Sequence, residues 1–213
     1  MSKVLREDIP RADNGVVQNE TFHRFYDPRY EALVVRILPG THYVTQDKEE
    51  MLVTILGSCI AACVRDPVTG IGGLNHFMLP DSKIDRWQEI SAAMRYGTYA
   101  MEVLINEVLA TGCKRDRLEI KIFGGANIVM GRKSIGHLNT AFVERYMETE
   151  GLAVAAKDLG GNRPRRIHYF PATGKVFRRI LDHPVDAKIF EQESKFRTRL
   201  ANASVGGDVE LFE

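Results

Sequence analysis

The chain has 213 residues, with 29 basic and 28 acidic side chains, and its formal net charge at pH 7 is only +1. This balance excludes an overall electrostatic field that would recruit nucleic acid or a membrane surface. The length suits one domain with a single core, and three cysteines are too few and odd in number for a disulfide framework, which predicts a reducing, cytoplasmic setting.

The first residues predict a polar arm. Residues 1–36 are interrupted by prolines and a glycine, and they begin with charges where a signal peptide needs an apolar run. No later stretch of about 18 apolar residues follows, so we expect no membrane insertion. We expect the N-terminal arm over 1–36, the domain over 37–202 and a flexible C-terminal tail over 203–213.

The segment that follows the arm is rich in β-branched and apolar residues and predicts strands. Residues 51–55 and 60–64 are apolar runs typical of buried strands, and residues 66–70 contain the proline and glycine of a turn. Residues 72–77 form the expected returning strand. Cys59 lies at a break in this pattern, just after a glycine and a serine.

Beyond residue 80 the pattern alternates between helix and strand. Apolar residues at a spacing of three and four mark one face of the longest expected helix: Met94, Met101, Leu104, Ile105 and Val108. The fold class is therefore a mixed α/β (α+β) single domain. We expect helices over 89–109, 139–150 and 186–201, and strands over 117–123, 152–156, 166–170 and 175–180.

Cys59 and His76 are the residues that suggest chemistry. A thiol has a pKa of about 8.5, so little of it is thiolate at neutral pH unless a base assists it. If residues 72–77 return beside the break at Cys59, they carry His76 toward the thiol. Local composition by itself favours a small buried hydrophobe instead, as most free cysteines are, and Cys63 fits that interpretation better.

The wider pattern resembles the CheD family of bacterial chemotaxis proteins. The resemblance covers residues 37–176, most of the chain, and several independent motifs fall in the family's order. The motifs are LGSC at 56–59, GLNHFMLP at 73–80, FGGAN at 123–127, IG at 135–136, DLGGNR at 158–163 and TGK at 173–175.

The resemblance implies a cysteine hydrolase that deamidates glutamine side chains of methyl-accepting chemotaxis receptors, whose cytoplasmic domains would be its partners. It implies Cys59 as nucleophile, His76 as base and Thr54 as the third catalytic member. It also implies β-sheets packed within helical layers, no metal or organic cofactor, and CheC as a further partner.

Five further residues are expected to form the oxyanion and substrate loops. The two glycines after strand 117–123 lack the lysine and the serine or threonine of a phosphate loop, so we expect a bend or a close backbone approach there and no nucleotide binding. The resemblance implies that this segment lies near the active site. The expected loop residues are Gly57, Ser58, Asn75, Gly124 and Gly125.

Two alternatives remain open from sequence. The chain could be a non-catalytic adaptor that binds receptors or CheC, which needs no reactive thiol, or a receptor methylesterase, because a thiolate attacks an ester as readily as an amide. The basic clusters at 163–166 and 178–179 are also open to two interpretations, a solvated face or a patch that meets an acidic partner.

Overall fold

The computed structural model describes residues 22–79, 87–127 and 135–181, together with 191, 195, 196 and 198. The strands of this described part form two sheets. Sheet A contains, in spatial order, β1 (Arg24–Asp27), β2 (Ala32–Arg36), β4 (Glu50–Leu56), β9 (Arg165–Tyr169) and β10 (Val176–Ile180). Sheet B contains β3 (His42–Thr45), β6 (Gly72–Asn75), β5 (Ile60–Arg65), β7 (Glu119–Gly124) and β8 (Val154–Leu159).

Each sheet mixes strand directions. In sheet A, β2 and β4 are parallel and the other pairs are antiparallel. In sheet B, only β7 and β8 are parallel. The sheets lie face to face and enclose a core to which both contribute apolar side chains: Val35, Leu52, Leu56, Ile167 and Tyr169 from sheet A, and Cys59, Ala61, Cys63, Leu74 and Phe123 from sheet B or its margin.

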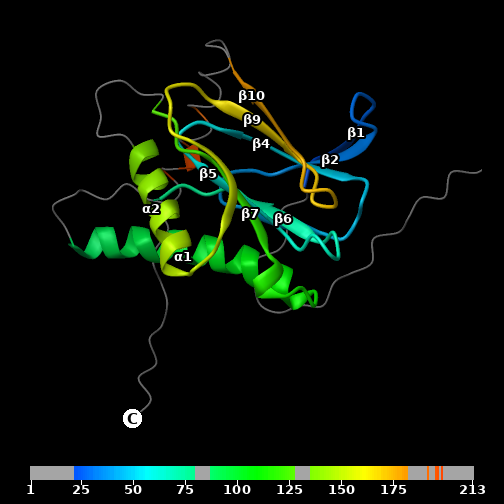
Figure 1. The fold of residues 1–213 in the computed structure, drawn as a ribbon. Coiled ribbons are helices and arrows are strands. Elements are labelled where there is room, and N and C mark those ends of the chain that lie inside the picture. The colour runs from blue at the N-terminus through cyan, green and yellow to red at the C-terminus, as the bar shows by residue number, and fades with distance from the viewer. Residues whose placement is uncertain are drawn as a thin grey trace, which may run out of the picture.

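Helices α1 (Trp87–Ala110) and α2 (Ile135–Thr149) pack on the other face of sheet B and make a third layer (Figure 1). Met101 and Leu104 of α1 are fully buried there, as their spacing predicts, whereas Met94 is 38% exposed. Gly112 ends α1 with a φ of 92°. None of the helices in the described part is long and apolar enough to span a bilayer.

The structure differs from the sequence expectation at the edge of sheet A that β1 and β2 form. Residues 24–27 and 32–36, expected to belong to an arm, are β1 and β2, because β2 adds to β4 in parallel and buries Val34 and Val35. Of the expected helical layers, α1 and α2 form the one on the outer face of sheet B. The tail 203–213 and most of the expected helix 186–201 lie outside those residues.

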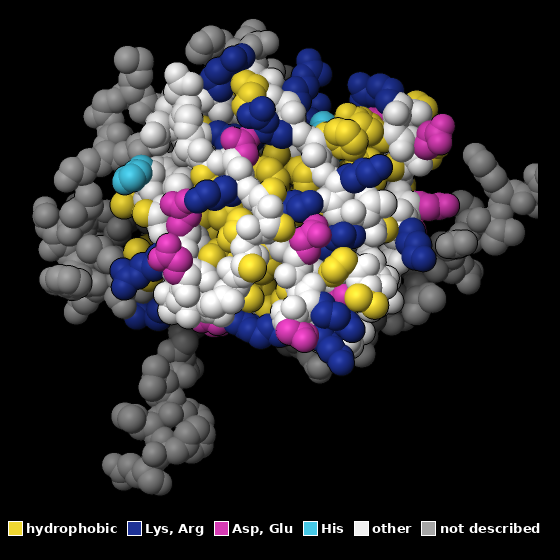
Figure 2. Space-filling view, in the orientation of Figure 1, with side chains coloured by type: hydrophobic (Ala, Val, Ile, Leu, Met, Phe, Trp, Pro, Cys, Tyr) yellow, Lys and Arg dark blue, Asp and Glu magenta, His cyan; other side chains and the backbone are white. Residues whose placement is uncertain are grey.

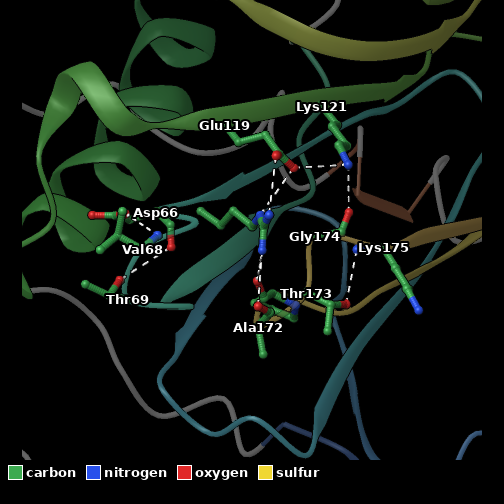
Figure 3. A network of polar contacts seen from close by, with 11 residues as sticks. Asp66, Val68, Thr69, Glu119, Lys121, Ala172, Thr173, Gly174 and Lys175 are labelled. Carbon is green, nitrogen blue, oxygen red and sulfur yellow. Dashed lines mark hydrogen bonds and ion pairs between the residues drawn. The ribbon is translucent and has the colours of Figure 1, made fainter.

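A polar network fastens the two sheets at one end. Arg65, the last residue of β5, pairs with Glu119 at 3.2 Å and donates to the carbonyl of Ala172 at 3.1 Å. Lys121 donates to the carbonyl of Gly174 at 2.7 Å (Figure 3). The turn of the β9–β10 hairpin in sheet A is thereby anchored to sheet B, at the end of β5 remote from Cys59.

Candidate active site

The strand register places Cys59 and His76 on one face of sheet B. Ile60 and Phe77 exchange two backbone hydrogen bonds of 2.8 and 2.9 Å, so Ala61 lies opposite His76. Cys59 is then the diagonal neighbour of His76, a relation in which side chains about 7–8 Å apart along the sheet can meet. Because side chains alternate along a strand, both residues point toward sheet A.

Thr54 meets His76 from the opposite sheet. Its Oγ1 lies 2.8 Å from His76 Nδ1 and 2.9 Å from the carbonyl oxygen of Ile37, to which it donates. A hydroxyl has one proton, so the Oγ1 that donates to Ile37 accepts from the ring. This assigns the proton of a neutral His76 to Nδ1 and leaves the lone pair on Nε2.

His76 Nε2 is the unusual atom of the site. His76 is 2% exposed, and Nε2 has no hydrogen-bond partner among the described residues. A buried polar atom without a partner costs free energy, so native proteins seldom retain one without a reason. A nitrogen that takes a proton during a reaction supplies such a reason.

The protonation of His76 follows from its surroundings. Burial lowers the pKa of His76 to about 3, and the backbone carbonyl of Ile37 opposes this shift without reversing it. The imidazole is therefore neutral at physiological pH, the form that can act as a base toward a thiol.

The turn that carries Cys59 is held by three donors. The carbonyls of residues 57, 58 and 59 accept hydrogen bonds from the amide of Ala126 at 2.8 Å, the side chain of Asn139 at 2.8 Å and the amide of Gly125 at 2.7 Å, respectively. Each donor comes from a segment more than 60 positions further along the chain. Each residue of the turn that carries the thiol is thus held by a hydrogen bond to its backbone carbonyl.

The glycine pair after β7 makes this bracing possible. A Cβ on Gly124, whose φ is 117°, would lie 2.0 Å from the carbonyl oxygen of Cys59. A Cβ on Gly125, whose φ is 69°, would lie 2.1 Å from Thr140 Oγ1. Both positions therefore require glycine, for space and for backbone conformation.

Other expected loop residues have different surroundings. Asn75 belongs to the face of sheet B that α1 covers: its side chain accepts from the amide of Ala62 and donates to the carbonyl of Ala100, each at 2.8 Å. Ser58 Oγ donates to Met78 Sδ at 3.6 Å. The structure thus brings Gly57, Ser58, Gly124 and Gly125 to the Cys59 turn, and it directs the Asn75 side chain away from it.

Asn139 is a site residue that sequence reasoning missed. It is completely buried, and besides holding the Ser58 carbonyl it accepts the amide of Leu79 at 2.8 Å. Position 139 was expected to begin a helix, where asparagine is a common cap. Because α2 begins at Ile135, Asn139 instead lies within the first turns and faces the core.

The site is closed in this structure. Cys59 is 0% exposed, and Tyr96 of α1 packs against the core cluster that contains it. Burial raises the pKa of Tyr96 to about 12, and the nearby Cys59 adds to the shift. A substrate therefore reaches the thiol only when the side chains around it move.

The sequence matches a protein-family model and curated relatives that share one name. The family model described as "CheD chemotactic sensory transduction" matches residues 78–180. A curated relative from Rhodopseudomonas palustris (strain BisA53) is 47% identical over 92% of this chain and 92% of its own length. A relative from Janthinobacterium sp. (strain Marseille) is 46% identical over 88% of this chain and 93% of its own length. Another, from Xanthomonas campestris pv. campestris (strain B100), is 44% identical over 92% of this chain and 98% of its own length. All three carry the name "Probable chemoreceptor glutamine deamidase CheD".

Gly124→Ala tests the close approach to the Cys59 turn. Gly112→Ala is the matched control, because Gly112 also has a positive φ, of 92°, but has no atom within 4 Å of the added Cβ. We expect the control to lose about 1–2 kcal/mol of stability from backbone strain alone. Gly124→Ala should lose clearly more and change the alkylation rate of Cys59, measured by urea unfolding and peptide mass mapping. Equal losses in the two variants would contradict the steric argument.

The pH dependence of stability tests the buried neutral imidazole. The folded pKa of His76, about 3, lies below the value of 6.5 of an unperturbed histidine, so the unfolded chain takes up a proton that the folded chain refuses. The contribution of His76 to the free energy of unfolding is fully present above about pH 6.5. It declines as the pH falls toward 3, by at most about 1.4 kcal/mol per pH unit. The free energy of unfolding, measured with urea at a series of pH values, should fall more steeply with decreasing pH in the wild type than in His76→Gln below about pH 6.5. Parallel slopes would show that His76 is not buried as a neutral ring.

Proposed function

The chain belongs to the CheD family, and from that premise we propose that it deamidates glutamine side chains of methyl-accepting chemotaxis receptors with Cys59 as nucleophile, His76 as base and Thr54 as the residue that orients the imidazole. The reaction is the one that the names of its relatives describe. The observation that carries the residue assignment is the contact between Thr54 Oγ1 and His76 Nδ1, which leaves Nε2 as the basic nitrogen on the face that Cys59 shares.

The first step forms a covalent bond between the enzyme and the glutamine. His76 Nε2 removes the thiol proton, and the sulfur of Cys59 attacks the side-chain carbonyl carbon, whose oxygen gains the negative charge. The amides of Ser58 and Cys59 are the proposed donors to this oxyanion.

The second step releases ammonia and then glutamate. The imidazolium of His76 gives its proton to the amide nitrogen, the carbon–nitrogen bond breaks, and a thioester to Cys59 remains. Water, deprotonated by the same Nε2, attacks the thioester and regenerates the thiol. One water is consumed, and one glutamine becomes glutamate and ammonia, so this chemistry requires no cofactor.

The transient imidazolium needs support because burial disfavours it. The carbonyl of Ile37 favours the protonated ring, and Thr54 holds the ring against that carbonyl. The oxyanion or the thiolate provides a negative charge beside the ring at the moment when it is positive. Substrate binding therefore supplies the charge that the free site lacks.

The proposal also covers the cellular location and the partners of the protein. All three cysteines, Cys59, Cys63 and Cys113, are free and buried, which supports a cytoplasmic location. The cytoplasmic domains of the receptors are the proposed substrates, and CheC is the proposed further partner.

Cys59→Ala tests the enzymatic proposal directly. We expect no ammonia release and no conversion of glutamine to glutamate when this variant is incubated with a purified receptor domain, as measured by an ammonia assay and peptide mass spectrometry. Cys63→Ala is the matched control, since Cys63 is an equally buried thiol on β5, and it should retain activity. Full activity of Cys59→Ala would exclude the thiol mechanism. Release of methanol instead of ammonia by the wild type would identify a methylesterase, and an absence of both products would favour an adaptor.

Thr54→Val tests the orienting role through a change that keeps the volume and removes the hydroxyl. Without that hydroxyl the ring can rotate or exchange tautomers, so kcat should fall by about two orders of magnitude while KM changes little. Thr54→Ser keeps the oxygen and should restore most of the activity. An inactive serine variant with an intact fold would show that the methyl group, and not the hydrogen bond, is what matters.

A further inference from the structure

A pocket rich in arginine lies on the outer face of sheet A, away from the core that contains Cys59. It lies between the β1–β2 turn and the β9–β10 hairpin, and four of its lining residues are Arg29, Arg166, Arg178 and Arg179. Figure 2 shows basic and hydrophobic side chains gathered over this upper part of the molecule. The described helices lie on the other side, against sheet B (Figure 1).

Within the described residues, two of these arginines have acidic partners and two do not. Arg29 pairs with Asp27 at 2.7 Å, and Arg178 pairs with Asp158 at 3.1 Å. For Arg166 and Arg179 the described part of the chain provides no carboxylate partner. The pocket therefore contains two guanidinium groups whose charge no carboxylate of the described residues compensates.

Arg166 and Arg179 also face each other directly. They are register partners in the antiparallel pair of β9 and β10, so their side chains leave the same face of the sheet from adjacent positions. Like charges in this relation destabilise a sheet. An anion bound between them would turn this repulsion into two attractive contacts, because a guanidinium pairs well with an oxyanion.

The walls of the pocket are aromatic and partly apolar. Tyr30 stacks on His168 with ring centroids 5.1 Å apart, and Phe177, the register partner of His168, is 50% exposed. Burial lowers the pKa of His168, and the charge of Arg166 lowers it further, in agreement with a positive field in the pocket. Aromatic walls suit an anion with an aliphatic stem better than a bare inorganic ion.

We propose that this pocket binds a glutamate side chain of an acidic peptide segment on a partner protein. The carboxylate lies between the guanidinium groups of Arg166 and Arg179, and the methylene groups pack against Tyr30 and Phe177. The site is separate from Cys59, because Arg166 points outward from β9 while its neighbour Ile167 points into the core opposite Thr54.

The test measures binding of labelled oligoglutamate to the full-length protein by fluorescence anisotropy, at low and at high salt. Oligoglutamate should bind, and its affinity should fall as salt screens the charges. Oligoaspartate, whose side chain is shorter, should bind less tightly, and oligoglutamine should not bind. Arg166→Gln and Arg179→Gln should each weaken binding by about tenfold, the loss expected for one charge-assisted hydrogen bond. Arg145→Gln, at an exposed position of α2, is the matched control and should bind as the wild type does.

Thermal unfolding separates lost binding from lost folding. Each glutamine variant removes the repulsion between the facing arginines, so its melting temperature should equal or exceed that of the wild type. Wild-type binding by both variants would overturn the proposal. An RNA oligomer or inorganic phosphate that occupies the pocket as tightly as oligoglutamate would overturn the assignment to a peptide glutamate. Because catalysis is not measured, the result is independent of the role of Cys59.

Discussion

One buried hydrogen bond, between Thr54 of sheet A and His76 beside sheet B, determines the geometry of the candidate active site. The bond of 2.8 Å forms only if the two sheets keep their packing distance, which the apolar side chains between them set. The Ile37 carbonyl takes the threonine proton, so the same contact also determines which ring nitrogen is basic. Packing of the inter-sheet core thus controls the protonation chemistry of the site.

Burial acts on this chemistry in two opposing ways. A low-dielectric surrounding keeps His76 neutral and strengthens the hydrogen bonds that orient it, yet it disfavours the ionic pair that a thiol and an imidazole must form. It also hides Cys59 from solvent in the free protein. In the proposed mechanism the site therefore reacts only when a substrate both opens it and contributes charge, which would restrict unintended modification of other proteins.

The strands that carry Cys59 and His76 were largely predictable because their signals are local, whereas the roles proposed for these two residues follow from the resemblance to the CheD family. The apolar runs around Cys59, the returning strand with His76 and the long helix α1 each follow from short-range patterns. Strands β1 and β2 were missed because β2 is stabilised by its parallel pairing with β4, which no local pattern records. The face to which the Asn75 side chain points depends on the strand pairing continuing as far as the bridge between Ile60 and Phe77. The role of Asn139 depends on where α2 begins. These features are set by tertiary contacts.

The bracing of the Cys59 turn by Gly125, Ala126 and Asn139 has a consequence for biosynthesis. The ribosome releases the cysteine many residues before it releases these three donors, and strand β9, which lies against β4, emerges later still. A nascent chain therefore carries an ordinary thiol on a loose turn. The proposed nucleophile acquires its surroundings only after β9 has been synthesised, so under the proposed mechanism truncated or partly folded products would lack the arrangement needed to modify other proteins.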